Sequence, residues 1–197
     1  ICSFLLIKRI TQPSDGNTSG TAMTRSLDEH SSSIEWTRVK KPVKLPILMY
    51  HSVHNMAESE AANANLIVDP ETFESQLKAL KNAGYYTLTP EEAYRILAKN
   101  EVPKGKKYVW LTFDDGGVED FYTIVYPLLK KYKMTATNNI ITDFTQKEKE
   151  NVLTFDQIKE MKSAGLTFES HTVNHPDLAN SSLETQKNEL VASKRLL

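Results

Sequence analysis

The chain has 197 residues, of which 25 are acidic and 24 are basic, and its formal charge is −1. This length is enough for one domain with a hydrophobic core, and the balanced charge argues against nucleic acid as a partner. The single cysteine, Cys2, excludes both an internal disulfide framework and a zinc site built from cysteines.

The first 44 residues show no pattern of a folded domain. Residues 1–10 begin with an apolar run that is too short to cross a bilayer, and we interpret them as the remnant of a truncated anchor or signal segment. Residues 11–44, whose first part is rich in small polar side chains, are predicted to form a flexible linker. This leaves attachment to a membrane or a cell wall through the N-terminus open. We expect the folded domain to occupy residues 45–197.

The domain begins with a strand followed by a helix. An apolar run over residues 47–50 predicts the first strand. Asp69 followed by Pro70 predicts the N-terminus of a helix, and Gly84 predicts its end. Residues 85–88 then predict a second short strand.

The later elements are predicted by the same signals. In chain order they are a helix over 90–99 with a capping box of Thr89 and Glu92, a strand over 108–113, a helical stretch broken near Pro127, a strand around 135–141, a helix with a capping box of Thr154 and Gln157 that ends at Gly165, a strand over 166–168, and a last helix that begins at Ser181 with Glu184. Such alternation of strand and helix predicts an α/β fold with a parallel sheet. Because no glycine-rich phosphate motif occurs, a barrel is preferred over a dinucleotide-binding fold.

Two adjacent acids end the strand predicted over 108–113. Asp114 and Asp115 follow this strand directly, and Gly116 and Gly117 then allow a tight turn. An ionised carboxylate is costly to bury without a positive partner, so the pair indicates a metal ion, a general base, or both. The alternative is an ordinary Asp-Gly turn.

Two histidines follow the strand predicted over 166–168. His171 and His175 are four residues apart, and Pro176 favours a loop that brings the two imidazoles together. With Asp115 they would supply one carboxylate and two imidazoles, a set typical of a catalytic divalent metal with an open coordination position. In a barrel, such residues lie at the C-terminal ends of strands, where both clusters are predicted. The alternative is a pair of surface histidines.

Two more histidines stand near the end of the first predicted strand. Either His51 or His54 is a candidate to line the site. A histidine that is simply packed and hydrogen-bonded near the barrel mouth is at least as good an interpretation, so neither is assigned to the metal.

The two clusters resemble the first two motifs of the polysaccharide deacetylases, the NodB-homology domain of carbohydrate esterase family 4. The motifs are residues 112–116 and 171–175. Supporting stretches are residues 46–53, 126–132 and 153–158, and the resemblance covers roughly residues 45–197. It implies a distorted (β/α) barrel, incomplete at the C-terminus. It also implies a metal-dependent hydrolase that removes N-acetyl groups from a polysaccharide containing N-acetylglucosamine, either an exopolysaccharide or peptidoglycan.

The resemblance implies a role for each residue of the site. Asp114 is the expected general base, and Asp115, His171 and His175 are the expected ligands of one divalent metal. Zinc is the first choice, and cobalt or nickel would suit the same ligands. The implied location is extracellular or at the cell surface. The alternative functions are a non-catalytic carbohydrate-binding relative and a metal-dependent esterase of another acetylated polysaccharide.

The sequence departs from the family pattern in three places. Gly117 stands where a larger residue is usual, and Asn138 and Asn139 replace an apolar or aromatic pair. The family's later arginine–proline, aspartate–tryptophan and Leu-x-His segments, the last of which supplies the general acid, do not occur in this sequence. We therefore expect the sequence as given to deacetylate poorly.

Overall fold

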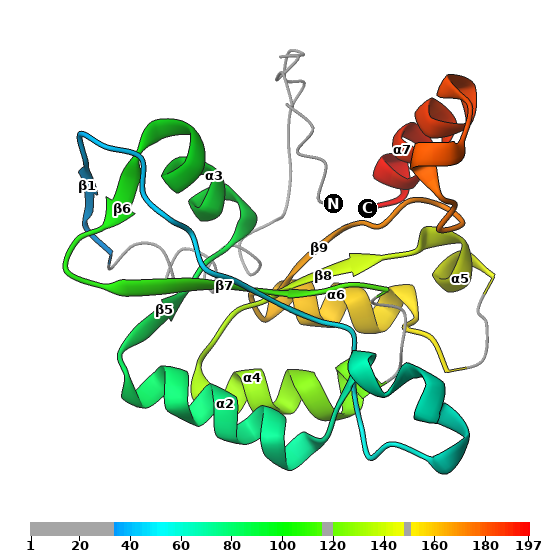
Figure 1. Cartoon of the computed structure of the whole chain (residues 1–197), viewed down its shortest axis with the longest axis horizontal. Helices are drawn as coiled ribbons and strands as arrows, with labels where there is room; N and C mark the ends of the chain where they lie inside the picture. The colour runs from blue at the N-terminus through cyan, green and yellow to red at the C-terminus, as the bar shows by residue number, and fades with distance from the viewer. Residues whose placement is uncertain (1–33, 116–119, 148–150) are drawn as a thin grey trace, which may run out of the picture.

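The structure is a computed structural model that describes residues 34–115, 120–147 and 151–197 (Figure 1). Residues 1–10, the greater part of the expected linker, and Gly116 and Gly117 lie outside these ranges. Within them, no helix is both long and apolar enough to cross a membrane.

A strand that the sequence did not indicate lies near the start of the described chain. β1 (Trp36–Arg38) pairs antiparallel with β6 (Glu101–Pro103). The guanidinium carbon of Arg95 lies 4.1 Å from the centre of the Trp36 ring, which fastens β1 to the helix that precedes β6. The linker expected over residues 11–44 therefore gives way to folded structure by Trp36.

Five parallel strands form the central sheet. They are β2 (Ile47–Tyr50), β5 (Tyr85–Thr87), β7 (Lys107–Phe113), β8 (Thr137–Ile140) and β9 (Thr167–Ser170). The order is β2-β7-β8-β9, and β5 pairs with the first part of β7. A separate parallel pair is formed by β3 (Ser52–Val53) and β4 (Ile67–Val68). Because β7 and β9 flank β8, residues that follow these two strands emerge at the same edge of the sheet.

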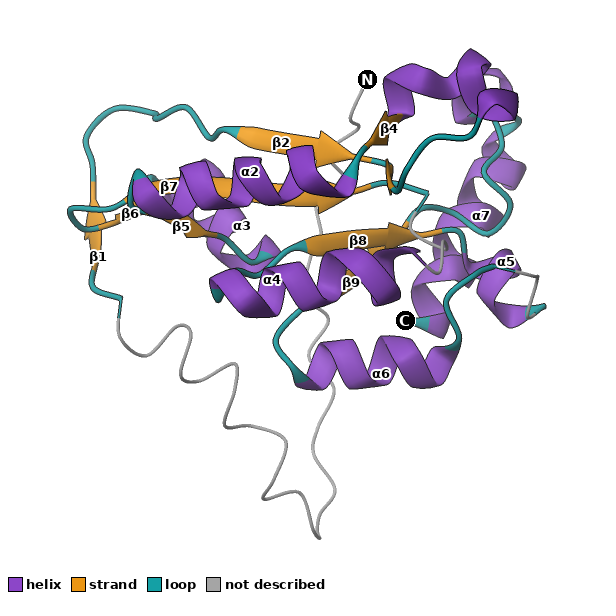
Figure 2. Ribbon diagram, turned by 90° about the horizontal axis from the view of Figure 1, so that it is seen from below, coloured by secondary structure: helices purple, strands orange, loops and turns teal. Residues whose placement is uncertain are grey.

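Helices follow most of the strands. They are η1 (Glu58–Leu66), α2 (Pro70–Asn82), α3 (Pro90–Lys99), η2 (Phe121–Val125), α4 (Tyr126–Tyr132), α5 (Thr142–Gln146), α6 (Phe155–Ser163), η3 (Leu178–Asn180) and α7 (Leu183–Leu196). Figures 1 and 2 show α2, α4 and α6 together on one face of the sheet. The alternation of strand and helix confirms the predicted α/β architecture with a parallel sheet.

The predicted helix starts are confirmed at three N-caps and shifted at a fourth. Asp69, Thr89 and Thr154 each accept a hydrogen bond from a backbone N–H in the first turn of their helices. The last helix begins one residue later than predicted, because the Ser182 side chain, not that of Ser181, accepts from the backbone N–H of Thr185. Glu184 is consequently one position too early to complete a capping box.

The core lies between the sheet and the three helices on that face. Phe113, the last residue of β7, is fully buried and stacks on Tyr50 with ring centres 5.1 Å apart. The Phe121 ring meets Phe113 edge-on at 4.9 Å, and the Phe73 ring does so at 5.9 Å. These contacts fix the C-terminal end of β7, the point from which Asp114 and Asp115 leave the sheet.

β2 is an edge of the described sheet, which does not close on itself within the described residues. Its pairing on one side, to β7, leaves Ile47 43% and Met49 55% exposed. Tyr50, by contrast, is buried against Phe73 and Phe113. The strand is therefore anchored at its C-terminal end, beside the two acids.

Candidate metal centre

The two acids at the end of β7 point to different partners because the backbone turns between them. The backbone N–H of Asp114 donates to the Tyr50 carbonyl at 2.9 Å, which extends the pairing of β7 with β2 by one residue. Asp115 then adopts a φ of 61°, a left-handed conformation that residues other than glycine rarely take. The chain thus leaves the sheet at Asp115.

The two histidines lie on a tight loop after β9, residues 171–175, which we call the histidine loop. Its start is held by a hydrogen bond of 2.8 Å from the His171 N–H to the Ile140 carbonyl on β8. Thr172 and His175 both have positive φ, 69° and 57°, and the His175 N–H donates to Oγ1 of Thr172 at 2.9 Å. This curl brings the two imidazole rings to a centre-to-centre distance of 4.9 Å.

The structure brings Asp115, His171 and His175 together across β8. Oδ1 of Asp115 lies 3.2 Å from Nε2 of His171 and 3.3 Å from Nε2 of His175. One ligand atom from each residue lies within 4.8 Å of the others. The loop expected from Pro176 and the preceding strand therefore exists, and both histidines face the same carboxylate oxygen.

The chemistry of this set fits a divalent cation. Two bonds of about 2.0–2.1 Å at a tetrahedral angle place their donor atoms about 3.3 Å apart, which matches both Asp115–histidine distances. Oδ1 of Asp115 is also buried and has no conventional hydrogen-bond partner. A buried carboxylate oxygen between two imidazole nitrogens is left undersatisfied by the protein alone.

The contact between Asp115 and His171 favours the charged form of each side chain. The contact with His171 lowers the pKa of Asp115 below its usual range, although burial acts in the opposite direction. The same contact raises the pKa of His171, again against the effect of burial. Ligation requires the neutral imidazole, so a cation at this position would compete with protonation of His171.

Asp114 is held by a hydrogen bond from Asn139, a residue that the sequence analysis noted but did not identify as its partner. Nδ2 of Asn139, on β8, donates to Oδ1 of Asp114 at 2.7 Å. The pairing of Phe113 with Asn138 places Asn139 at the level of the first acid. The departure at Asn138 and Asn139 from an apolar or aromatic pair was the available signal, although it does not name Asp114 as the partner.

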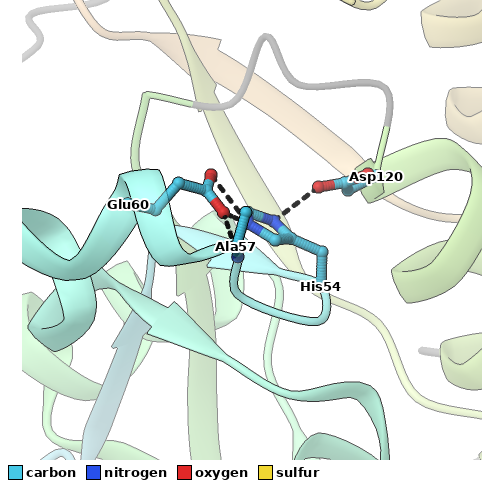
Figure 3. Close-up of polar contacts among 4 residues, drawn as sticks. All are labelled: His54, Ala57, Glu60 and Asp120. Carbon is cyan, nitrogen blue, oxygen red and sulfur yellow. Dashed lines mark hydrogen bonds and ion pairs between the residues drawn. The ribbon is translucent and has the colours of Figure 1, made fainter.

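The two remaining candidate histidines occupy different surroundings. His51 is partly buried, and its charge is the smallest of the effects that lower the pKa of Asp115. His54 instead lies between two carboxylates, as Figure 3 shows, with Nδ1 2.7 Å from Asp120 and Nε2 3.0 Å from Glu60. His54 therefore joins η1 to the start of η2 and does not belong to the cluster of Asp115.

Comparison with known proteins gives relatives of one kind. The polysaccharide deacetylase family profile matches residues 101–197. YxkH of Bacillus subtilis (strain 168), assigned to the polysaccharide deacetylases, is 40% identical over 161 residues, which are 82% of this chain and 54% of YxkH. The poly-beta-1,6-N-acetyl-D-glucosamine N-deacetylase of Staphylococcus aureus (strain MSSA476) is 37% identical over 134 residues, 66% of this chain and 44% of that protein. The chain thus spans about half the length of the curated relatives it matches.

Solved structures give the same result for the fold. The Streptococcus pyogenes deacetylase PplD, solved in complex with acetate, matches with a TM-score of 0.75 and 53% identity, over 80% of this chain and 69% of PplD. A polysaccharide deacetylase from Bacillus cereus matches with a TM-score of 0.66 and 33% identity, over 78% of this chain and 46% of the other. The predicted barrel type is confirmed, and the open parallel sheet is the part of it that this chain forms.

Proposed function

The chain belongs to the polysaccharide deacetylase family, and on this premise we propose that it acts in the metal-dependent removal of N-acetyl groups from a polysaccharide containing N-acetylglucosamine. The observation that carries the proposal is the convergence of Asp115, His171 and His175 on one point, with the carboxylate of Asp114 on the adjacent residue. A metal site and a neighbouring base are the two requirements for attack of water on an amide.

Asp115, His171 and His175 would hold the cation, and zinc suits this donor set best, with cobalt or nickel as alternatives. When bound, a divalent cation supplies polarisation of the acetyl carbonyl and a lowered pKa for a water molecule. The histidine loop and the turn at Asp115 then serve to fix three ligand atoms and leave the remaining directions open to water and substrate.

Asp114 is the proposed general base. It accepts one proton from the water whose oxygen attacks the acetyl carbon. The C–N bond then breaks, acetate leaves, and the sugar nitrogen becomes a free amine by taking up a proton from a general acid, a role that the Leu-x-His segment fills in the family. Asn139 donates to Oδ1 of Asp114, and the ionised carboxylate keeps further acceptor positions for the proton of the water.

The proposed substrate class is a polymer of N-acetylglucosamine. The Staphylococcus aureus relative is named for poly-beta-1,6-N-acetyl-D-glucosamine, which favours an exopolysaccharide, and peptidoglycan carries the same acetamido group. Both polymers lie outside the cytoplasm, so we place the protein outside the cell or at its surface, with attachment through the N-terminal segment as part of this proposal.

Acetate release tests the proposal. The chain, loaded with zinc or cobalt, is incubated with β-1,6-linked N-acetylglucosamine oligomers, with peptidoglycan fragments, and with acetylated xylan. Acetate from a glucosamine substrate is expected at a low rate, because the Leu-x-His segment that supplies the general acid in the family does not occur in this sequence, and it should be lost in Asp114→Asn. Acetate release from xylan alone would favour the alternative function, a metal-dependent esterase of another acetylated polysaccharide. Metal and oligosaccharide binding without acetate release would favour the non-catalytic relative only if a form of the protein that also carries a Leu-x-His segment released none.

A further inference from the structure

The carboxylate of Glu189, on α7, is buried against the histidine loop. Its side chain is only 9% exposed, although glutamate is a residue that proteins rarely bury. It has no basic partner among the contacts recorded for the described residues. A buried charge of this kind requires hydrogen-bond donors that compensate for its lost hydration.

The histidine loop supplies these donors. Oε2 of Glu189 accepts hydrogen bonds from the backbone N–H of Val173 at 2.8 Å and of Asn174 at 2.9 Å. Oε1 accepts from the side-chain amide of Asn174, also at 2.9 Å. Val173 and Asn174 lie between the two proposed ligands, so Glu189 binds the middle of the segment that joins His171 to His175.

With these bonds, every backbone N–H of the histidine loop has an acceptor. The N–H groups of the first, second and last residues of the loop donate to the Ile140 carbonyl, to Oγ of Ser170 and to Oγ1 of Thr172. Glu189 accepts the other two N–H groups, and it is the acceptor that comes from outside the sheet and the loop. Without it, both would lose their partners at once.

The opposite side of the loop is held by α5. The carbonyl groups of Thr172 and Val173 accept from the backbone N–H groups of Thr142 at 3.2 Å and Asp143 at 3.0 Å. The loop therefore lies between the N-terminus of α5 and the carboxylate of Glu189. Hydrogen bonds on both sides of the loop stabilise the positive φ values of Thr172 and His175, which are unfavourable for residues other than glycine.

The balance of charge and hydrogen bonding at Glu189 agrees with this arrangement. Burial alone would raise the pKa of this carboxyl group. The hydrogen bonds from Asn174 and Val173 outweigh burial and bring the pKa below its usual value. Ionised Glu189 can accept all three bonds, whereas a neutral amide in its place would have a single acceptor oxygen.

We propose that Glu189 is a positioning residue for the metal centre, which holds the histidine loop in the conformation that directs His171 and His175 at Asp115. The inference rests on the metal site of the proposed function and adds a residue that does not touch the cation. Groups that orient metal ligands from behind typically contribute 10–100-fold to metal affinity.

The test compares Glu189→Gln with Glu184→Gln in the full chain. Both changes remove one carboxylate from α7, but Glu184 is exposed in the first turn of the helix. Titration with zinc, and with cobalt followed by its visible spectrum, should show an affinity about 10–100-fold lower in Glu189→Gln and an unchanged affinity in Glu184→Gln. Amide exchange at Val173 and Asn174, measured without metal, should be faster in Glu189→Gln alone.

Two results would overturn the inference while the metal site stands. These are wild-type zinc affinity in folded Glu189→Gln, or equal losses in Glu189→Gln and Glu184→Gln. If Glu189→Gln does not fold, Asn174→Ala decides, because it removes only the side-chain bond to Oε1 of Glu189. A lower zinc affinity in that variant supports the inference, and an unchanged affinity overturns it.

A different result would refute the proposed function as well. If the wild-type chain binds no zinc, or binds it equally well after His171→Ala and His175→Ala, the metal site is wrong and the role of Glu189 falls with it. The amide-exchange arm separates the cases, since it reports whether Glu189 orders the loop whatever the metal does.

Discussion

Asn139 donates a hydrogen bond of 2.7 Å from its side-chain amide to Oδ1 of Asp114. Asp114 directly follows β7 and Asn139 lies on the neighbouring strand β8, 25 positions later in the sequence. The bond restrains the carboxylate of the proposed base, while the carboxylate of Asp115, the next residue, lies beside both histidines. The orientation of the base and the assembly of the metal site therefore depend on separate contacts.

Replacement of Asn139 by alanine should reduce turnover without affecting metal binding. A base that rotates freely spends less time in the geometry that accepts the proton, and we expect kcat to fall about tenfold. KM and zinc affinity should stay at their wild-type values, since the side-chain amide of Asn139 donates to the proposed base and not to one of the three proposed ligands. Parallel measurement of kcat, KM and zinc content checks this, and a loss of zinc in Asn139→Ala would contradict it.

The two adjacent aspartates should respond differently to the same substitution. Asp114→Asn should retain zinc and lose about 10²–10⁴-fold in kcat, the usual size of a general-base contribution. Asp115→Asn should lose zinc first, because its Oδ1 is the oxygen that faces both histidines. Elemental analysis of the two purified variants tests the difference. Equal zinc loss in both would show that the roles are not divided in this way.

His54 should contribute to stability and not to metal binding. Its ring bridges Glu60 and Asp120 and is 20% exposed, so His54→Ala leaves two partly buried carboxylates without their shared partner. We expect a small loss of stability, seen as a fall in Tm of about 2–4 °C for a chain of this size, because solvent screens the partly exposed carboxylates. Lys104→Ala is the control, since the ion pair of Lys104 with Glu35 is largely exposed and should contribute little.

For His54→Ala, thermal unfolding and zinc titration are measured on the same samples. Wild-type thermal stability would show that the bridge in Figure 3 contributes nothing measurable to the fold. A large loss of zinc affinity would place His54 in the metal site, against the geometry.

Glu189 should make stability depend on acid pH. Because its folded-state pKa is lowered, its contribution is present above its unfolded pKa of about 4.3 and is lost as the pH falls through the lower folded value. The stability difference between wild type and Glu189→Gln should therefore be constant near neutrality and shrink below about pH 4. Denaturant unfolding at several pH values measures it, and a difference that grows toward low pH would have the wrong sign.

Local sequence signals predicted those elements whose causes are local. The N-caps at Asp69, Thr89 and Thr154 depend on side chains and N–H groups three residues apart, and all three are present. The buried strand that ends at Phe113 was also predicted from local sequence, because a run of apolar residues is followed directly by two acids. Both clusters of the site were predicted from such strand ends, and the structure places them together.

The contacts that escaped prediction join residues that are distant in the sequence. β1 is three residues long and pairs with β6 more than sixty residues later, so it has no periodicity of its own. Glu189 accepts from backbone N–H groups 15 and 16 residues away, and a bond donated by the backbone does not depend on which side chain the donor residue carries. Asn139 was visible as an anomaly, but its partner follows from strand order, which the sequence does not specify.

The position of Glu189 in the chain has a consequence for protein synthesis. Asp115 is translated first, then both histidines, and the carboxylate that orders their loop comes 14 residues after His175. A nascent chain that has reached Pro176 holds every ligand but lacks the acceptor for two loop N–H groups. The proposed ligands are therefore synthesised before the carboxylate that binds their loop, and if Glu189 has the proposed role, the metal centre would be complete only after α7 has docked.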